Sequence, residues 1–456
     1  MNKREERRDM RKEARVWRVV VLVSSMLLVS VGLASASDPI PAKAQDHPIA
    51  LVGGTIHPVT GPDIPNGTIL FEKGKITGIG ASVDLPEGTE RIDVAGKQIY
   101  PGLINANSTL GLSEIEAVRA TNDFAETGEV NPNVRGEIAV NPESELIPTT
   151  RANGVVVANV MPQGGIVSGK SAAIMLDGWT AEDLVLKAPV GLVVNWPTMT
   201  IQRYPWITQS EADQMKERDR QLKVLRDLFD DARAYAVAKK AEEAKGVPFH
   251  PTDLRLESMI PVLDRVVPVF VRANEMTQIE AAVQWAKDEK VRLVIVSGRD
   301  SWRVADLLKE NNVPVIVGPI LDVPSRDWEA YDNAFTVPAK LSVAGVPFAI
   351  SGEGEAFAER NTPYQAAMAA AYGLPKEEAL KAITIYSAKV LGIDDRVGSL
   401  ETGKDATLIV TTGDPLEIET NVTMEFIQGK KIDLRSRHTI LYEKYREKYK
   451  QLGILK

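Results

Sequence analysis

Short apolar runs alternate with longer amphipathic stretches through the middle of the chain. Eight of these runs are apolar on both faces and rich in β-branched residues, a pattern typical of buried parallel strands. They lie at residues 98–106, 154–161, 171–178, 191–196, 266–273, 291–298, 313–320 and 346–353. Eight such strands with helices between them predict an α/β fold, a (β/α)₈ TIM barrel over residues 101–393, and about 250 residues are typical of this fold.

Shorter β-prone runs, broken by turn residues, lie on both sides of this region. Residues 49–100 contain a predicted hairpin turn at 72–75, and similar runs recur over residues 394–434. Neither set is large enough to form a stable sheet alone. We therefore expect the two segments to pair into one small β-sandwich, a composite domain made from both chain ends, followed by a helical tail at residues 435–456.

Two longer segments interrupt the barrel pattern. Residues 211–245 predict a long helix, with Ser210 as N-cap and Gly246 and Pro248 ending it. Its apolar stripe, which we expect to pack on the barrel, consists of Leu222, Leu225, Phe229, Ala232 and Ala236. The polar stretch 113–148 follows the first strand, and we expect a loop over the barrel mouth there.

The first 36 residues are arranged like a secretory signal peptide. Basic residues between positions 3 and 18 precede an apolar run at 19–34, and Ala34-Ser35-Ala36 is an A-x-A cleavage site. The apolar run is shorter than the about 20 residues of a membrane span, although an uncleaved anchor is the alternative. We expect a Sec-type signal and a secreted or periplasmic bacterial protein that has no stable membrane span after cleavage.

Composition restricts the possible chemistry. The chain of 456 residues has a net charge of −8, and loss of residues 1–36 would make it more acidic, which argues against a nucleic-acid partner. No cysteine is present, which excludes disulfides, Cys-ligated metals and a thiol nucleophile. The four histidines lie away from the predicted barrel mouth, so a Ser-His-Asp site is excluded as well; they are His47, His57, His250 and His438.

One segment matches a nucleotide-binding signature letter for letter. Residues 164–171, GGIVSGKS, fit the P-loop pattern G-x-x-x-x-G-K-[ST]. A P-loop needs a helix directly after this pattern, but Asp177-Gly178 follows too soon for one. We interpret the segment as a glycine-rich turn between two barrel strands.

Two segments resemble the metal-dependent amidohydrolase superfamily. YPGLINANSTL, at 100–110, resembles its first barrel strand, which has the pattern P-G-[LF]-I-D-x-H-x-H. Residues 361–416, with VGSLETGKDA, resemble the end of its barrel and the return into its sandwich. The likeness covers nearly all of residues 49–434 and is closest to exported proteins of the imidazolonepropionase-like branch. It implies the same barrel and sandwich, and hydrolysis of C–N bonds in non-peptide or small-peptide amides.

The resemblance also implies one or two divalent metals at the barrel mouth, but the ligand positions of the first and fifth strands have changed. The aspartate and the two histidines of the first strand correspond to Asn105, Asn107 and Thr109. Arg272 stands where the histidine of the fifth strand is expected, and a permanent cation there would repel a divalent metal. Neutral amides and a hydroxyl are poor ligands for zinc.

The remaining ligand positions also differ. Ser297-Gly298-Arg299 follows the sixth strand without a histidine, and Asn195 or Trp196 lies near the position of the bridging ligand. Glu353 corresponds best to the final aspartate. The degenerate set predicts that no cofactor is bound, with a divalent metal such as zinc only if the resemblance outweighs the lost ligands.

The residues leave different functions open for the barrel mouth, including that of a pseudoenzyme. Arg272 and Glu353 could form an ion pair that fills the space of the metal. They could instead line a pocket with Asn105, Asn107 and Thr109 that binds a small anionic molecule or a small peptide, with Arg272 holding a carboxylate. Weak metal-free catalysis would use Glu353 or Glu275 as general base and Arg272 to stabilise the oxyanion.

Two further alternatives place the function elsewhere. An active hydrolase could use an unrecognised carboxylate or metal site that includes Glu275, Glu353 or Glu355. A non-catalytic envelope protein could serve a structural role, bind a partner or form a homo-oligomer.

Overall fold

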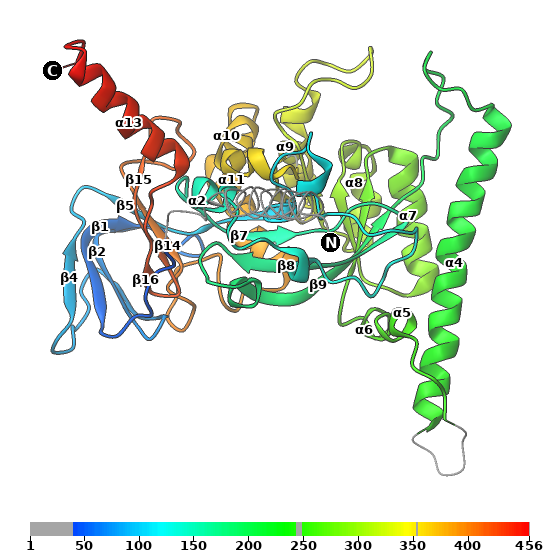
Figure 1. Ribbon diagram of the computed structural model, residues 1–456, viewed down its shortest axis with the longest axis horizontal. Coiled ribbons are helices and arrows are strands. Elements are labelled where there is room, and N and C mark those ends of the chain that lie inside the picture. Colours follow the sequence, from blue (N-terminus) through cyan, green and yellow to red (C-terminus); the bar gives the residue numbers. More distant parts are fainter. Residues whose placement is uncertain (1–39, 243–248, 353, 456) are drawn as a thin grey trace, which may run out of the picture. The chain divides into compact units, whose positions relative to one another are not determined.

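The computed structural model describes residues 40–242, 249–352 and 354–455 (Figure 1). The predicted signal peptide at 1–36 therefore lies outside the described residues, as do Gly246, Pro248 and Glu353. Among the described residues, no helix is both long enough and apolar enough to cross a bilayer.

Eight strands form a nearly closed barrel, and their order around it follows their order in the sequence. The first and last strands of the sheet, β6 and β13, lie next to each other. All eight predicted barrel strands are present. They are β6 (Leu103–Ser108), β7 (Val155–Val160), β8 (Val167–Met175), β9 (Val185–Asn195), β10 (Val269–Ala273), β11 (Leu293–Ser297), β12 (Val315–Val317) and β13 (Phe348–Ile350).

One strand corrects the prediction of an all-parallel barrel. β8 runs antiparallel to both of its neighbours, β7 and β9, whereas the other adjacent pairs are parallel. The reason lies in the connection, because a parallel crossover needs a dozen or more residues and only residues 161–166 join β7 to β8. Strands of either direction are buried on both faces here, so the apolar pattern does not reveal the direction.

The segment that matches a P-loop lies in this short connection and in the first half of β8. Gly164 and Gly165 have φ angles of +84° and +64°, a left-handed conformation that glycine adopts without steric cost. The chain continues as β8 to Met175, so no helix begins here. The interpretation as a glycine-rich turn between barrel strands is confirmed.

Helices and short 3₁₀ turns (η) connect the barrel strands, and a last helix, α13, follows the final strand of the chain. Those before β10 are η1 (Arg119–Thr121), η2 (Gly136–Ala139), α2 (Leu146–Arg151), α3 (Ala181–Leu184), α4 (Glu211–Glu242), α5 (Leu254–Glu257) and α6 (Ile260–Leu263). Those after β10 are α7 (Met276–Glu289), η3 (Ser301–Val304), α8 (Ala305–Glu310), α9 (Asn333–Ala344), η4 (Ala356–Asn361), α10 (Thr362–Ala371), α11 (Lys376–Ala382), α12 (Ile385–Leu391) and α13 (Arg437–Gln451).

The long helix α4 begins and packs as predicted. The Ser210 hydroxyl accepts a hydrogen bond from the backbone amide of Asp213 at 3.1 Å, which satisfies a free N–H group of the first turn. The buried face includes Leu225, Phe229 and Ala232 of the predicted stripe. The Phe229 ring meets the Trp285 ring of α7 edge to face at 5.1 Å, so the stripe packs against the barrel layer.

Strands from both chain ends form a second sheet, which confirms that the two segments pair. The link is the antiparallel pairing of β5 (Gln98–Pro101) with β14 (Leu408–Thr411). The Lys73-Gly74 turn, with φ angles of 50° and 78°, joins two strands at the predicted hairpin. The other strands are β1 (Ile49–Ile56), β2 (Ile64–Glu72), β3 (Lys75–Gly80), β4 (Glu90–Asp93), β15 (Val422–Ile427) and β16 (Lys430–Lys431).

The predicted loop at 113–148 lies against the first half of β8. The backbone amide of Asn131 donates to the Val167 carbonyl at 2.9 Å, and that of Lys170 donates to the Val134 carbonyl at 2.8 Å. Two η turns and the start of α2 lie within the segment, so it is ordered by backbone pairing and is not a free loop. It continues directly from the end of β6, where the candidate site begins.

Candidate ligand site at the barrel mouth

β6 positions the first three candidate residues. Asn105, Asn107 and Thr109 alternate along the strand and its end, so their side chains share one face. All three are buried, and Asn105 is fully so. The Asn105 side-chain oxygen accepts a hydrogen bond from the backbone amide of Asn107 at 3.3 Å, which fixes the orientation of the first amide.

β10 carries Arg272 to the same place. Its Nη2 atom donates to the side-chain oxygen of Asn107 at 3.1 Å and lies 3.7 Å from the Met161 sulfur. Burial lowers the pKa of Arg272 to about 10, because desolvation disfavours the charged form. Its Nε atom is buried and has no hydrogen-bond partner within the described part of the chain. Arg272 therefore brings a cation and an unused donor to the mouth.

A buried carboxyl group that the sequence did not reveal completes this cluster. Glu359, in η4 after the last barrel strand, accepts a hydrogen bond from the side-chain amide of Asn105. Its side chain is 1% exposed, and burial raises its pKa well above the ordinary value. The Ser108 hydroxyl and the Thr109 backbone amide oppose this shift without cancelling it. Glu359 is thus held in its neutral form more strongly than a surface glutamate.

Thr109 closes the cluster on the side of the last strand. Its hydroxyl donates to the Gly354 carbonyl at 2.8 Å, which ties the end of β6 to the segment after β13. A Cβ atom at Gly354 would lie 2.9 Å from the Asn107 side-chain nitrogen, and the φ angle of this glycine is +75°. The close approach of the two segments therefore depends on glycine at this position.

The candidates near the fourth strand have structural contacts. Asn195 donates through Nδ2 to the Gly165 carbonyl at 2.8 Å and to the Ser168 hydroxyl at 3.0 Å, so it holds the turn between β7 and β8. Trp196 is buried, with its ring 5.5 Å from that of Trp285. Among the described residues, neither the Asn195 nor the Trp196 side chain forms a hydrogen bond with Asn107 or Arg272.

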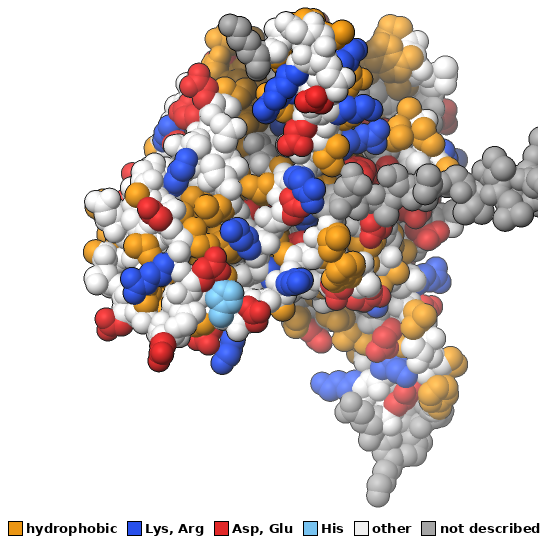
Figure 2. Space-filling view, turned by 60° about the vertical axis from the view of Figure 1, so that its left-hand side comes forward, with side chains coloured by type: hydrophobic (Ala, Val, Ile, Leu, Met, Phe, Trp, Pro, Cys, Tyr) orange, Lys and Arg blue, Asp and Glu red, His pale blue; other side chains and the backbone are white. Residues whose placement is uncertain are grey.

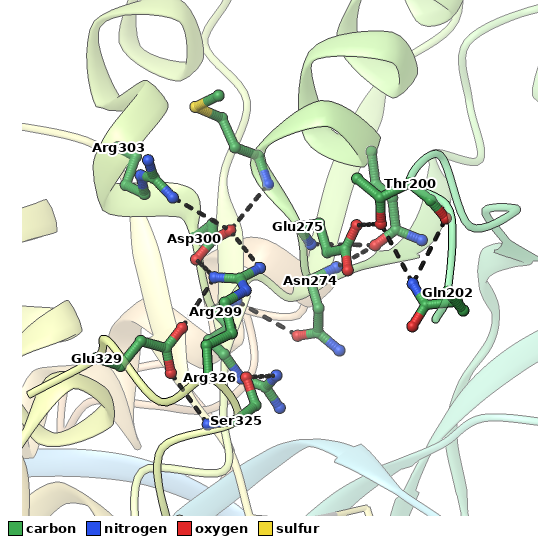
Figure 3. Close-up of polar contacts among 12 residues, drawn as sticks. Thr200, Gln202, Asn274, Glu275, Arg299, Asp300, Arg303, Ser325, Arg326 and Glu329 are labelled. Carbon is green, nitrogen blue, oxygen red and sulfur yellow. Dashed lines mark hydrogen bonds and ion pairs between the residues drawn. The ribbon is translucent and has the colours of Figure 1, made fainter. Parts of the chain in front are cut away.

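A second polar cluster lies at the ends of β10 and β11 (Figure 3). Asp300 is buried and accepts two hydrogen bonds from Arg326, both at 2.9 Å, in a fork-like pair. Arg326 also donates to Glu329 at 2.8 Å, and these carboxylates, Asp300 first, raise the pKa of Arg326. This network anchors residues 325–329 of the connection between β12 and α9 beside the mouth.

The candidate residues after the fifth and sixth strands join the same network. Arg299 donates to the Ser325 hydroxyl at 2.6 Å and forms an ion pair with Asp322 at 3.6 Å. Glu275, in the middle of Figure 3, accepts a hydrogen bond from the Thr200 hydroxyl at 2.7 Å. Arg299 therefore positions a loop. Glu275, three residues after Arg272 in the sequence, binds Thr200 in the segment that follows β9.

Comparison with known proteins assigns this architecture. A family model described as "Amidohydrolase family" matches residues 224–432. A solved structure of an amidohydrolase from Thermotoga maritima MSB8 is 28% identical, covers 85% of this chain and 100% of its own, and superposes with a TM-score of 0.77. Residues 224–432 thus match the amidohydrolase family, and the chain is similar in fold and sequence to a solved amidohydrolase. This agrees with the resemblance of its first strand and its C-terminal segment.

Other relatives are more distant. Amidohydrolase tasK of Hapsidospora irregularis is 20% identical over 386 residues, which is 80% of this chain and 39% of that protein, so the chain spans about two fifths of its length. A prolidase structure complexed with N-methylphosphonate-L-proline is 16% identical, covers 85% of this chain and 99% of its own, and has a TM-score of 0.53. At that identity the likeness shows the fold alone.

Among the described residues, the side chains at the mouth offer few of the ligands that the metal implied by the family resemblance would need. Within residues 40–242, 249–352 and 354–455, no group of three or more His, Cys, Asp or Glu side chains lies close enough together to hold a metal ion. The amide oxygen of Asn107 already accepts from a guanidinium, and the carboxyl group of Glu359 is held toward its neutral form. Zinc prefers deprotonated nitrogen, sulfur and carboxylate ligands, which this set does not offer.

The structure unites some of the predicted site residues and leaves others apart. Asn107 and Arg272 are in direct contact, and Asn105 and Thr109 lie beside them on one face of β6. The predicted contact of Arg272 with Glu353 involves a residue outside the described range. Glu359 was missed because it lies 254 residues from Asn105. The one local signal for it was the group of carboxylates that follows the last barrel strand.

Proposed function

We propose that the barrel mouth of this amidohydrolase-family chain binds a small molecule that carries a carboxylate next to an amide, such as an N-acyl amino acid or a small peptide. The observation that carries the proposal is Arg272, a partly buried guanidinium with an unused Nε donor and no ion pair among the described residues. A bound carboxylate would supply both the missing acceptor and the missing charge.

Asn107 and Asn105 give the proposed pocket its second recognition element. The Asn107 side chain holds the guanidinium through its oxygen, so its NH₂ group is the part that can donate to a ligand carbonyl. Asn105 is already committed to Glu359 and to the Asn107 backbone. We propose that Arg272 binds the carboxylate, that Asn107 binds the neighbouring amide carbonyl, and that Asn105 with Glu359 fixes the wall behind them.

The same residues support binding without the metal of the family. In this proposal the positions of Asn105, Asn107, Thr109 and Arg272 recognise the ligand instead of holding zinc. Elemental analysis of the purified protein tests this part separately from ligand binding. About one tightly bound zinc ion per chain would contradict it, and a protein without stoichiometric metal would agree with it.

Thermal shift measurements test the ligand class. N-acetylglycine and glycylglycine are compared with N-acetylglycinamide, which has the same size but no carboxylate. We expect the two acids to raise Tm in a concentration-dependent way and the amide to leave it unchanged. Equal shifts with all three compounds would refute recognition by Arg272.

A matched pair of variants places the ligand. Arg272→Gln removes the charge but keeps hydrogen-bond donors, and it should abolish the Tm rise caused by N-acetylglycine. Arg255→Gln removes an exposed arginine of α5 and should leave the rise unchanged. Isothermal titration measures the binding of N-acetylglycine to both variants directly. The Tm of each variant without ligand shows whether the substitution has changed the fold.

We also propose that the chain is exported and that residues 1–36 are its signal peptide. The proposal is supported by the basic region, the apolar run and the Ala34-Ser35-Ala36 site. N-terminal sequencing of the protein from its native cell envelope tests it directly. A mature chain that begins directly after Ala36 is expected, and a chain that retains its first residues would contradict cleavage.

A further inference from the structure

A cavity of about 600 Å³ lies at the end of the barrel opposite the mouth. Residues at the beginnings of β10, β11 and β12, such as Pro268, Leu293 and Val313, line it, whereas the mouth is formed where these strands end. We call it the basal cavity. Its volume is within the range of about 300–1,000 Å³ that is usual for small-molecule sites.

The charged residues of the basal cavity all have one sign. Its lining includes five cationic side chains and no carboxylate: Arg265, Lys287, Lys290, Arg292 and Lys389. None of the five forms an ion pair with a carboxylate in the described part of the chain. The chain as a whole has a net charge of −8, and on the face drawn in Figure 2 Lys and Arg side chains lie among Asp and Glu side chains. The basal cavity therefore departs from the charge pattern of the molecule.

The backbone around the cavity shows a second, independent departure. Arg265, Lys290 and Asn312 line it, and all three have left-handed φ angles, of 62°, 57° and 50°. Side chains other than glycine rarely adopt this conformation because Cβ meets the carbonyl oxygen. Asparagine tolerates it, whereas lysine and arginine adopt it at a steric cost, as Lys73 also does at an exposed turn.

The neighbouring connection shows what this chain uses when the side chain is not needed. Lys290 ends α7 three residues before β11, and Gly345 ends α9 three residues before β13. The closing hydrogen bonds are the same: the amide of Lys290 donates to the carbonyls four and three residues earlier, and so does that of Gly345. Glycine thus satisfies the geometry at one position, and a lysine that faces the cavity replaces it at the other.

The local electrostatics agree with an excess of positive charge. Lys187 donates to the carbonyls of Leu391 and Gly392 at 3.2 and 2.8 Å. Its pKa is lowered, first by burial and then by the positive charge of Arg292, while Asp395 and Asp394 oppose the shift without cancelling it. Within the described ranges, the hydrogen bonds of the Arg292 guanidinium are two long ones, at 3.5 and 3.4 Å, to the carbonyls of Arg265 and Val266. Most of its guanidinium donors are therefore available to a ligand.

We propose that the basal cavity binds a small organic polyanion, a molecule with two or more carboxylate or phosphate groups on an apolar frame. The cations surround an apolar floor that includes Val283, Val291 and Val313. The anionic groups would pair with the lysines and arginines, and the frame would lie on the valines. Such a ligand would stabilise the fold from the end of the barrel that is opposite the proposed mouth site.

Isothermal titration with benzene-1,3,5-tricarboxylate tests the proposal, at low salt and at about 0.15 M salt, where charges are screened beyond about 8 Å. Inorganic pyrophosphate serves as an anion without an apolar frame, and benzene-1,3,5-trimethanol as a frame without charge. We expect the tricarboxylate to bind more tightly than pyrophosphate, salt to weaken it, and the triol not to bind. Absence of saturable binding of the tricarboxylate, or equal binding of the triol, would overturn the proposal.

Lys290→Gly is the informative variant, because it removes the cation while favouring the backbone. We expect an unchanged or higher Tm and affinity for the tricarboxylate that is weaker by about tenfold or more, the effect of losing one charged hydrogen bond. Lys73→Gly makes the same change at an exposed turn with φ of 50° and should leave affinity unchanged.

The variants also separate this site from the barrel mouth. Equal affinity in Lys290→Gly and in the unmodified protein would overturn the proposal, as would a lower Tm of that variant. Loss of affinity in Arg272→Gln with full affinity in Lys290→Gly would assign the tricarboxylate to the mouth and would also overturn it. Loss in Lys290→Gly with full affinity in Arg272→Gln supports the basal cavity whatever the mouth binds.

Discussion

Replacing Glu359 by glutamine should make the protein relatively more stable as the pH rises. Glu359 is buried, accepts a hydrogen bond from Asn105, and has a pKa raised well above its ordinary value by desolvation. Glutamine has the same shape, can accept the same hydrogen bond and has no charge to desolvate. Glu359→Gln therefore removes one titration from the folded state and leaves the contact with Asn105 in place.

The magnitude follows from the linkage between protons and folding. An unfolded glutamate titrates near pH 4.3 and the folded Glu359 well above it, so the folded state binds one more proton between these two values. A carboxyl group whose pKa is raised by folding contributes its full stability at pH values below the pKa of the unfolded state. This stability is lost as the pH rises toward the pKa of the folded state. The loss is about 1.4 kcal/mol for each pH unit in that window. The variant lacks this loss, so its advantage grows by the same amount.

Urea unfolding at one-unit steps from pH 5 to pH 8 measures the effect. The difference in the free energy of unfolding between Glu359→Gln and the unmodified protein should rise in favour of the variant at each step below the pKa of the folded Glu359 and level off above it. Other buried carboxyl groups titrate in both proteins and cancel in the difference. Glu280→Gln, at an exposed position of α7, is the control and should give a difference that does not depend on pH. A flat difference for Glu359→Gln, or one that favours the unmodified protein at pH 8, would refute the reasoning.

Three further substitutions test buried positions elsewhere in the fold. Glu425→Met should raise the urea midpoint at pH 8 by the equivalent of about 1–3 kcal/mol. Both carboxyl oxygens of Glu425 are buried without a hydrogen-bond partner among the described residues, and burial raises the pKa of this group. An unchanged midpoint would contradict this prediction. Asp177→Asn should lower the free energy of unfolding by about 3–5 kcal/mol in the same assay, since it leaves the buried Arg151, 3.2 Å away, without its carboxylate. A loss below about 1 kcal/mol, the contribution of an exposed salt bridge, would contradict this prediction. Gly191→Ala should cost about 1–3 kcal/mol and lower Tm, because the new Cβ atom would lie 2.9 Å from the Phe270 ring, and an unchanged Tm would show that the ring can move.

The sequence predicts the strands of the barrel well because burial on both faces is a local property. Val155–Val157 and Leu293–Val296 are apolar throughout, and each forms a strand. The direction of β8 is not local in this sense. It depends on the six residues between β7 and β8, and a connection of that length was the available signal. Gly164 and Gly165, which lie in the segment that matches the P-loop pattern, are the residues that form this turn.

The candidate site was predictable only where the chain aligns with a family pattern. Asn107 and Arg272 come from separate strands, and the position of each in its own motif was enough to bring them together. Glu359 belongs to no such motif. Its burial depends on the backbone path after the last strand, which the Thr109 contact with Gly354 helps to fix. A contact between residues so far apart in sequence has no periodic signal.

Position, more than residue type, decides what a cation does in this chain. Arg326 lies between Asp300 and Glu329, and these carboxylates raise its pKa. Arg272, of the same type and two strands away, has its pKa lowered by burial, with no opposing carboxylate among the described residues. Desolvating an unpaired cation is costly, and such a cost persists in a fold when the charge serves a ligand. A ligand carboxylate at the mouth would place Arg272 in the situation that Asp300 already provides for Arg326, and would reverse the direction of its pKa shift.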